Sequence, residues 1–334
     1  YLNFVSWLDP LGIPVVLLTG SQSAAERKRC IAAIESGEAL VAVGTHALFQ
    51  GSVSFHRLAL TVVDEQHRFG VHQRMALKDK GQLPHQLVMT ATPIPRTLTM
   101  ALYADMDVST LDELPAGRQP ITTTVMADDR RDEVLAHLAT ELDSGRQAYW
   151  VCPLIEETDA LDAASVEGTL PLLEAALPGR RIGVLHGKMK SEEKARVMSE
   201  FKSGHLQLLL ATTVVEVGVD VPNATLMVIE NPERMGLAQL HQLRGRVGRG
   251  AHSSYCVLLY ATPLAETSRR RLAVIRESQD GFRIAEEDLN IRGPGDLMGT
   301  RQTGEQQFRI ADLRSHAHLM PEVIRRGDSL LSSD

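Results

Sequence analysis

The sequence predicts an α/β protein with two parallel-sheet lobes, the first of them incomplete, followed by a helical hairpin and carboxyl-terminal region. Short apolar runs alternate with helical patterns on both sides of a stretch at 111–120, which is rich in proline, glycine and charge but has no periodicity. Strands that alternate with helices need crossover connections, and such connections make a sheet parallel. After Thr262 the alternation gives way to helical spacing alone. The predicted domains are therefore 1–117, 118–262 and 263–334.

In the first lobe we expect a helix over 21–35, because Ser23 and Glu26 have the spacing of a capping box and Gly37 is a natural stop. Four apolar runs around this helix are expected to be strands, at 15–18, 40–43, 58–63 and 87–89.

The second lobe repeats the alternation. Its expected strands are at 147–154, 182–185, 206–211, 224–229 and 255–260. Its expected helices are at 130–142, 166–177 and 191–201, the last opened by Ser191 as the capping residue. Two further helices are expected at 264–277 and 281–289, and Arg269, Arg270 and Arg271 are expected on a solvated face of the first.

The composition is that of an ordinary globular protein, with 334 residues of which 43% are hydrophobic and 23% charged. A formal net charge of −7 excludes a wholly basic surface but allows a local basic track. Three widely spaced cysteines without a CxxC pair favour reduced thiols in a cytoplasm over disulfides or a zinc site. No membrane-length apolar run and no signal-peptide pattern occur, so we expect no membrane partner. Tyr1 is not an initiator, so we expect the chain to be part of a longer protein.

Two adjacent carboxylates, Asp64 and Glu65, directly follow the strand expected at 58–63. Ligands of open parallel sheets bind at the carboxyl ends of the strands. Two carboxylates at the end of a buried strand cost free energy unless they are paired, hydrogen-bonded or near a cation. Nucleotide hydrolysis uses such a pair, one carboxylate for Mg²⁺ and one for the attacking water. The alternative is an acidic turn that caps the following helix.

The most unusual stretch is 239–250, with three arginines and three glycines, which we do not expect to be the end of a packed helix. Glycine allows close approach to a ligand, and arginine offers a planar fork of donors that fits phosphate oxygens. Arg246 and Arg249 are therefore predicted to contact a nucleotide phosphate held by the other lobe, as an arginine finger does. A solvated basic loop is the alternative.

Several motifs together resemble one family. The box Asp64-Glu65-Gln66-His67, the segment Thr90–Thr92, the segment 212–220 and the segment 242–249 resemble four motifs of superfamily 2 helicases, in order. More narrowly, DEQHRFG, TATPIPRTL, VIENPERMGLAQLHQLRGRVGRG and LNIRGPGDLMGTRQTG resemble the RecG family of bacterial branched-DNA helicases. The resemblance covers residues 19 to about 307 and implies RecA-like lobes.

The resemblance implies a role for each matching residue. Asp64 holds Mg²⁺ with ATP, and Glu65 acts on the hydrolytic water. Gln242, Arg246 and Arg249 complete the catalytic set, with Gly218 and Asp220 near the nucleotide. Coupling or DNA contact is implied for Thr19, Gly20, Gly44, Thr45, His46, Gln66, His67, Thr90, Thr92, Thr212 and Thr213. In the hairpin region, Arg292, Arg301 and Gln302 are implied to turn lobe closure into movement along duplex DNA; a simple packing cap is the alternative.

The resemblance thus implies an ATP-dependent DNA helicase, with ATP and Mg²⁺ as cofactors, that remodels stalled replication forks and Holliday junctions in recombination and repair. Branched double-stranded DNA is the implied partner, with a single-stranded DNA-binding protein as a further one, in a bacterial, nucleoid-associated cytoplasmic setting.

One departure is that no GxxxxGK[ST] loop occurs, so the usual cradle for the β- and γ-phosphates is missing. The family's amino-terminal wedge domain is missing too. We therefore expect this chain alone to bind ATP weakly or not at all.

Two other functions stay open. A transcription-repair coupling translocase of the Mfd type shares TATPIPRTL and the hairpin, although that family typically has DEEH where this chain has Gln66. A non-catalytic nucleic-acid clamp would fit if no phosphate-binding loop preceded Tyr1.

Overall fold

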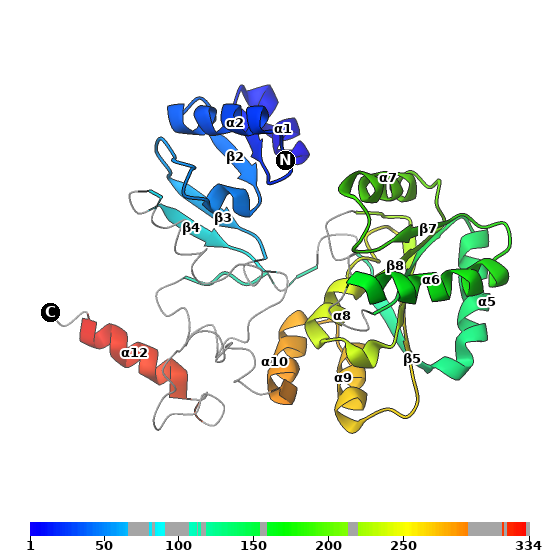
Figure 1. Ribbon diagram of the computed structural model, residues 1–334. Coiled ribbons are helices and arrows are strands. Elements are labelled where there is room, and N and C mark those ends of the chain that lie inside the picture. The colour runs from blue at the N-terminus through cyan, green and yellow to red at the C-terminus, as the bar shows by residue number, and fades with distance from the viewer. Residues whose placement is uncertain are drawn as a thin grey trace. The chain divides into compact units, whose positions relative to one another are not determined.

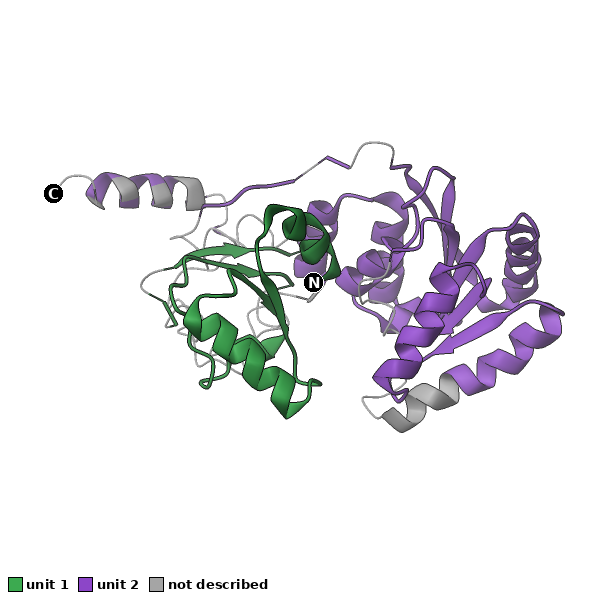
Figure 2. Ribbon diagram, turned by 90° about the horizontal axis from the view of Figure 1, so that it is seen from above, with its two compact units in different colours: residues 1–91 green, residues 92–334 purple. Residues whose placement is uncertain are grey.

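The computed structural model describes most of the chain (Figure 1). The described residues are 1–65, 80–81, 84–90, 107–111, 113–114, 118–153, 159–212, 220–292, 316 and 319–331. The chain divides into two compact units, Tyr1–Ala91 and Thr92–Asp334 (Figure 2). The boundaries expected at 117/118 and 262/263 from the sequence stay predictions.

The first unit contains two pairs of parallel strands. Strand β1 (Val15–Leu18) pairs with β2 (Val41–Gly44), and β3 (Leu60–Val63) pairs with β4 (His85–Val88). Helix α2 (Ala24–Ser36) packs on β1. Its small core consists of Leu18, Ile34, Ala47 and Val53. Helix α1 (Leu2–Leu8) precedes these elements.

The predicted capping box of α2 is confirmed. The Ser23 hydroxyl accepts from the Glu26 N–H at 3.3 Å, and the Glu26 carboxylate accepts from the Ser23 N–H at 3.2 Å. Gly37 ends the helix with φ of 80°, a left-handed conformation that glycine adopts without a Cβ penalty. These signals act within three or four residues, which is why the sequence predicted both helix ends closely.

The second unit is built on one six-stranded parallel sheet with strand order β5-β10-β9-β6-β8-β7. Its strands are β5 (Ile121–Ala127), β6 (Gln147–Val151), β7 (Ile182–Leu185), β8 (Leu208–Ala211), β9 (Ala224–Glu230) and β10 (Ser254–Tyr260). Its helices are α5 (Arg131–Asp143), α6 (Asp159–Ala176), α7 (Ser191–Lys202), α8 (Leu237–Arg244), α9 (Glu266–Glu277), α10 (Gly281–Arg292) and α12 (Met320–Leu331). The parallel α/β architecture predicted from the alternation is confirmed.

Helices cover both faces of this sheet (Figure 1). One face packs on α5 and α6 through strand residues such as Trp150 and Leu210. The opposite face packs on α7 to α10 through the strand residues next to these in sequence, such as Tyr149 and Leu209, because side chains alternate between the two faces of a strand. Because both faces are covered, β6, β8 and β9 are buried along their whole length. Continuous apolar runs in the sequence identified these central strands for that reason.

Three expectations about local structure were wrong or incomplete. Strand β5 was not predicted: its three threonines interrupt the apolar pattern, as an edge strand with partly exposed residues permits. The stretch 239–250 begins inside a packed helix, because α8 runs to Arg244 and buries leucines at 237, 240 and 243. Lys190, not Ser191, is the capping position of α7, and its N–H donates to the Glu193 carboxylate at 3.2 Å.

Candidate functional site

The carboxyl ends of β1 and β2 bring together five residues for which the resemblance implied coupling or DNA contact: Thr19, Gly20, Gly44, Thr45 and His46. Leu18 pairs with Gly44 in the parallel register, and the Thr45 N–H donates to the Leu18 carbonyl at 3.3 Å. Gly20, Gly44, Thr45 and His46 are exposed. A Cβ on Gly44 would lie 2.3 Å from the Leu18 oxygen, so only glycine fits this approach. The two loops therefore form one exposed polar edge.

Gln22 holds the loop that carries Thr19, a role that the sequence did not reveal. Its side-chain oxygen accepts from the Thr19 N–H at 2.9 Å, and its side-chain nitrogen donates to the Leu17 carbonyl at 2.9 Å. A glutamine in a short polar turn has no distinctive signature, so tertiary geometry alone identifies this bridge.

Asp64 and Glu65 lie at the carboxyl end of β3, as predicted. The Asp64 carboxylate accepts from the Glu65 N–H at 2.9 Å, and Glu65 adopts φ of 50°. A non-glycine residue in the left-handed region is strained, and such strain is concentrated at functional sites. Thr90 lies two residues after the neighbouring strand β4, and the intervening Met89 N–H donates to the Val63 carbonyl at 2.8 Å. Gln66, His67 and Thr92 lie outside the described residues.

The residues at this strand end suit a Mg²⁺ ion that arrives with a nucleotide. Asp64 is exposed and Glu65 is half-buried, so one carboxylate is accessible to solvent. Mg²⁺ is usually bound by one or two carboxylates with waters and substrate phosphates completing its shell. No cluster of three or more acidic, histidine or cysteine ligands occurs in the described part of the chain. The donor set thus fits a shared metal rather than a cage made by protein alone.

In the second unit, Thr212 follows β8 at the carboxyl edge of the sheet. Its N–H donates to the Leu185 carbonyl at 3.1 Å, and the residue is 0% exposed. A fully buried side chain offers no surface to DNA, so the structure gives no support to the implied DNA contact of Thr212. Thr213 and Gly218 lie outside the described residues.

Asp220, Arg246 and Arg249 lie at the opposite, amino-terminal edge of that sheet. Asp220 precedes β9, and both arginines precede β10. The backbones of these two loops are in close contact, because a Cβ on Gly250 would lie 2.4 Å from the Pro222 carbonyl oxygen. Strands of four to seven residues separate the two edges by roughly 13–23 Å. The structure therefore separates the predicted nucleotide-facing residues from Thr212.

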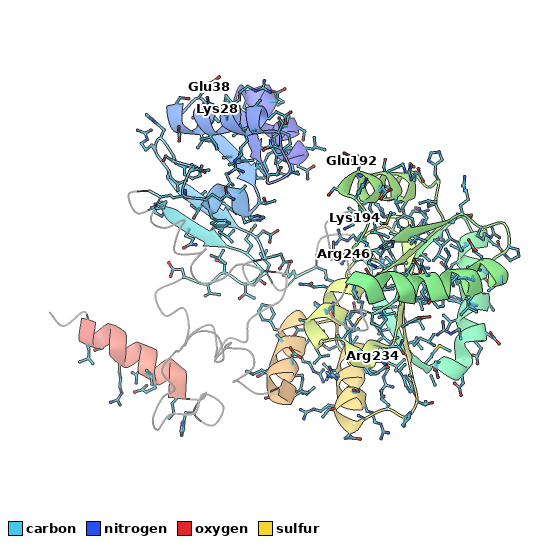
Figure 3. All side chains as sticks on the ribbon, viewed as in Figure 1. Lys28, Glu38, Glu192, Lys194, Arg234 and Arg246 are labelled. Carbon is cyan, nitrogen blue, oxygen red and sulfur yellow. The ribbon has the colours of Figure 1, made fainter. Side chains whose placement is uncertain are left out.

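Residues 245–250, which we call the arginine loop, are arranged around the carbonyl of Gly245, the residue that directly follows α8. The Arg249 Nε donates to this oxygen at 3.1 Å, and the Arg249 Nη1 lies 3.5 Å from the Asp220 carboxylate. Side-chain exposures of 31% for Arg249 and 58% for Asp220 leave both groups open to a ligand. Gln242 lies in α8 and is half-buried, as is Arg246, which lies on the same side of the unit as α8 (Figure 3).

Tyr149 marks how far the charge of this loop reaches into the protein. Burial raises the pKa of the Tyr149 hydroxyl to about 12, while the positive charges of Arg246 and Arg249 act in the opposite direction. The tyrosine is therefore a neutral, buried neighbour of the arginine loop at physiological pH.

Arg244, the first arginine of the stretch, is a structural residue. It is buried, and its Nη1 donates to the carbonyls of Ile275 at 2.6 Å and Ser278 at 2.8 Å, while its Nη2 lies 2.9 Å from the His241 Nδ1. The guanidinium thus caps the last turn of α9, where helix carbonyls lack partners within the helix. Neither a solvated loop nor a phosphate contact describes this residue.

Arg271 also departs from the expected solvated face of α9. It donates to the carbonyls of Met235 at 3.0 Å and Glu233 at 3.1 Å. The expectation holds better for Arg269, which pairs with Glu266 at 3.5 Å on an exposed surface. In the hairpin region, Arg292 ends α10, and Arg301 and Gln302 lie outside the described residues. Among the residues that the structure describes, no helix has the length and apolar character needed to cross a membrane.

A parallel sheet with helices on both faces, and a match of residues 130–251 to the helicase conserved C-terminal domain, define the second unit as a RecA-like helicase lobe. Residues 278–334 match the C-terminal part of domain 3 of the ATP-dependent DNA helicase RecG. The chain belongs to the RecG family.

The relatives agree with this assignment. The ATP-dependent DNA helicase RecG of Escherichia coli (strain K12) is 58% identical over 329 residues, which cover 97% of this chain and 47% of the relative. RecG of Acidithiobacillus ferridurans is 52% identical over 334 residues, covering 100% of this chain and 49% of the relative. A solved structure of RecG bound to a three-way DNA junction matches with a TM-score of 0.71 and 42% identity, over 96% of this chain and 41% of that one. The chain thus spans about half the length of the curated relatives it matches.

Proposed function

We propose that the protein containing this chain is an ATP-dependent double-stranded DNA translocase that remodels stalled replication forks and Holliday junctions. The observation that carries this proposal is the 42% identity, over 96% of the chain, to a RecG that was solved on a three-way DNA junction. Contact with a single-stranded DNA-binding protein and association with the bacterial nucleoid are part of the same proposal.

Hydrolysis is assigned to the carboxylates of the first unit and the arginines of the second. Asp64 would hold Mg²⁺, and Glu65 would orient the attacking water and accept its proton. Bound Mg²⁺ would neutralise charge on the phosphates. Arg246 and Arg249 would contact the γ-phosphate, with Gln242, Gly218 and Asp220 nearby. The strained backbone of Glu65 and the exposed guanidinium of Arg249 support these roles.

DNA contact is assigned to the edge formed by the ends of β1 and β2. Its exposed glycines and hydroxyl groups can approach a phosphate backbone closely. Gln66, His67, Thr90, Thr92 and Thr213 would couple this grip to the nucleotide state. Arg292, Arg301 and Gln302 would transmit lobe closure to the duplex.

Glu65→Gln, placed in a protein that supplies a GxxxxGK[ST] loop together with this chain, tests the chemistry. We expect loss of DNA-stimulated ATP hydrolysis with nearly unchanged binding to forked DNA, because the amide keeps the shape but cannot accept the proton. Glu38→Gln, an exposed carboxylate of the same unit (Figure 3), is the matched control and should hydrolyse ATP normally. Normal hydrolysis by Glu65→Gln would remove Glu65 from the mechanism.

Gln302→Ala and Arg301→Ala, in the same protein, test the transmission. Hydrolysis should persist while fork unwinding, measured by strand displacement, should fall. If Gln302→Ala unwinds forks normally, the hairpin region does not transmit movement.

The 334-residue chain itself should show no DNA-stimulated ATPase activity, because it contains no GxxxxGK[ST] loop. Measurable activity from this chain would show that phosphates are held in another way.

A further inference from the structure

Arg118 lies in the second unit, three residues before β5, and contacts the arginine loop. Its Nη2 donates to the Gly245 carbonyl at 3.2 Å. This is the oxygen that also accepts from the Arg249 Nε at 3.1 Å. Two guanidinium groups, separated by more than a hundred residues in sequence, therefore meet at one carbonyl at the carboxyl end of α8. The negative end of a helix dipole is a favourable place for both cations.

Positive charge exceeds negative charge around the Gly245 carbonyl, where Arg118 and Arg249 face the single carboxylate of Asp220. Burial lowers the pKa of Arg118, the positive charge of Arg249 lowers it further, and the Asp220 carboxylate opposes this change. Asp220 thus acts on both arginines, and its contact with Arg249, at 3.5 Å, is long for an ion pair. The charge of one carboxylate thus acts on two guanidinium groups, which leaves an excess of positive charge beside exposed donors. Such an arrangement attracts an anion with several oxygens.

We propose that Arg118 is a positioning residue for the anion site of the arginine loop. Arg118 shares the Gly245 carbonyl and the Asp220 charge with Arg249, and so keeps Arg249 from closing into a full ion pair with Asp220. Arg249 then remains available to an anionic oxygen. The identity of that anion, a terminal phosphate of a nucleoside triphosphate, rests on the function proposed above, whereas the site itself does not.

The removal of Arg118 has a specific consequence in this arrangement. Without Arg118, no second guanidinium competes for the Asp220 charge, so Asp220 pairs more fully with Arg249 and the net positive charge beside the loop falls by one. The additional change Asp220→Asn restores that excess and releases Arg249. A residue that merely supported the fold would not be rescued by a second change at a partly exposed carboxylate.

Inorganic tripolyphosphate is the probe, titrated into the 334-residue chain by calorimetry at low ionic strength, where charge contacts are least screened. We expect Arg118→Ala to weaken binding about tenfold, equivalent to about 1.4 kcal/mol. Arg118→Lys should stay within about threefold of the unsubstituted chain, because the ammonium keeps the charge. Arg118→Ala combined with Asp220→Asn should recover to within about threefold.

Arg130→Ala is the matched control, since it removes the same charge from an exposed pair with Glu133 beyond the carboxyl end of β5. It should change tripolyphosphate affinity less than about twofold. Equal effects of Arg118→Ala and Arg130→Ala would overturn the proposal, and so would the absence of saturable binding to the unsubstituted chain. A loss in Arg118→Ala that the Asp220→Asn change does not recover would assign Arg118 to the fold alone.

The failure of the proposed function would look different. In a protein that also supplies the GxxxxGK[ST] loop, absence of ATPase activity despite Arg118-dependent tripolyphosphate binding would refute the motor and leave this anion site standing. If the motor is active, Arg118→Ala should raise the KM for ATP more than it lowers kcat, because it alters the availability of a phosphate contact.

Discussion

Arg244→Ala should destabilise the second unit strongly, because this guanidinium is the buried cap of α9. The substitution removes two short hydrogen bonds to the carbonyls of Ile275 and Ser278 and one contact with the His241 ring. Hydrogen bonds from a charged donor contribute about 1.5–3 kcal/mol each, and truncation of one partner in a buried polar network costs about 3–5 kcal/mol. We therefore expect a loss of about 3–5 kcal/mol from the free energy of unfolding, a large share of the 5–15 kcal/mol typical of a domain.

Urea unfolding followed by tryptophan fluorescence measures this loss. Trp150 is 0% exposed in the sheet of the second unit, whereas Trp7 is 62% exposed in the first unit. A Trp7→Phe background leaves Trp150 as the reporter, since the chain has two tryptophans. Arg269→Ala removes a charge from an exposed pair on α9 and should cost less than about 0.5 kcal/mol.

A loss below about 1 kcal/mol for Arg244→Ala, or one equal to that of Arg269→Ala, would refute the assignment of Arg244 as a cap. The result expected of a phosphate-facing arginine is the reverse: an unchanged free energy of unfolding and weaker tripolyphosphate binding. The two measurements together therefore distinguish a structural arginine from a ligand-binding one.

Three further outcomes are expected. Burial, and then the positive charges of Arg244 and Arg118, lower the pKa of His241 to about 4 from an ordinary value of 6.5. Between these two pH values the unfolded chain therefore binds a proton at His241 that the folded chain does not bind. Stability should fall as the pH drops from about 6.5 to about 4, by up to about 3 kcal/mol, and a urea series for His241→Asn should lack this part of the slope. Gly44→Ala should lower the thermal midpoint of the first unit by several degrees because its Cβ would lie 2.3 Å from a carbonyl oxygen, whereas Gly51→Ala, with nothing within 4 Å, should not; equal midpoints would contradict the close approach. Iodoacetamide at pH 8 should modify Cys30 alone in the folded chain, as read by mass spectrometry, because burial raises the pKa of the other two thiols to about 12.

The sequence alone determined the α/β class, the central strands and the family. Strands buried on both faces appear as continuous apolar runs, so β9 (Ala224–Glu230) was predicted within one residue of its observed bounds, at 224–229. The capping box of α2 was readable for a similar reason, since its two side chains and its stop lie within one or two helical turns. Asp64 and Glu65 are adjacent in sequence and follow a strand, so their place at the end of β3 also followed from local pattern.

Only the tertiary structure decided what each arginine of the stretch 239–250 does. Arg244 binds carbonyls that lie 31 and 34 residues further along the chain, and Arg249 shares its carbonyl with Arg118, which lies 127 residues before Gly245. Composition gives every arginine the same fork of donors, but burial and neighbouring charge differ at each site. The same side chain is therefore a helix cap at Arg244 and a solvent-accessible, charged donor at Arg249, because the hydrogen-bond partners and the solvent exposure that separate these roles exist only once distant segments pack together.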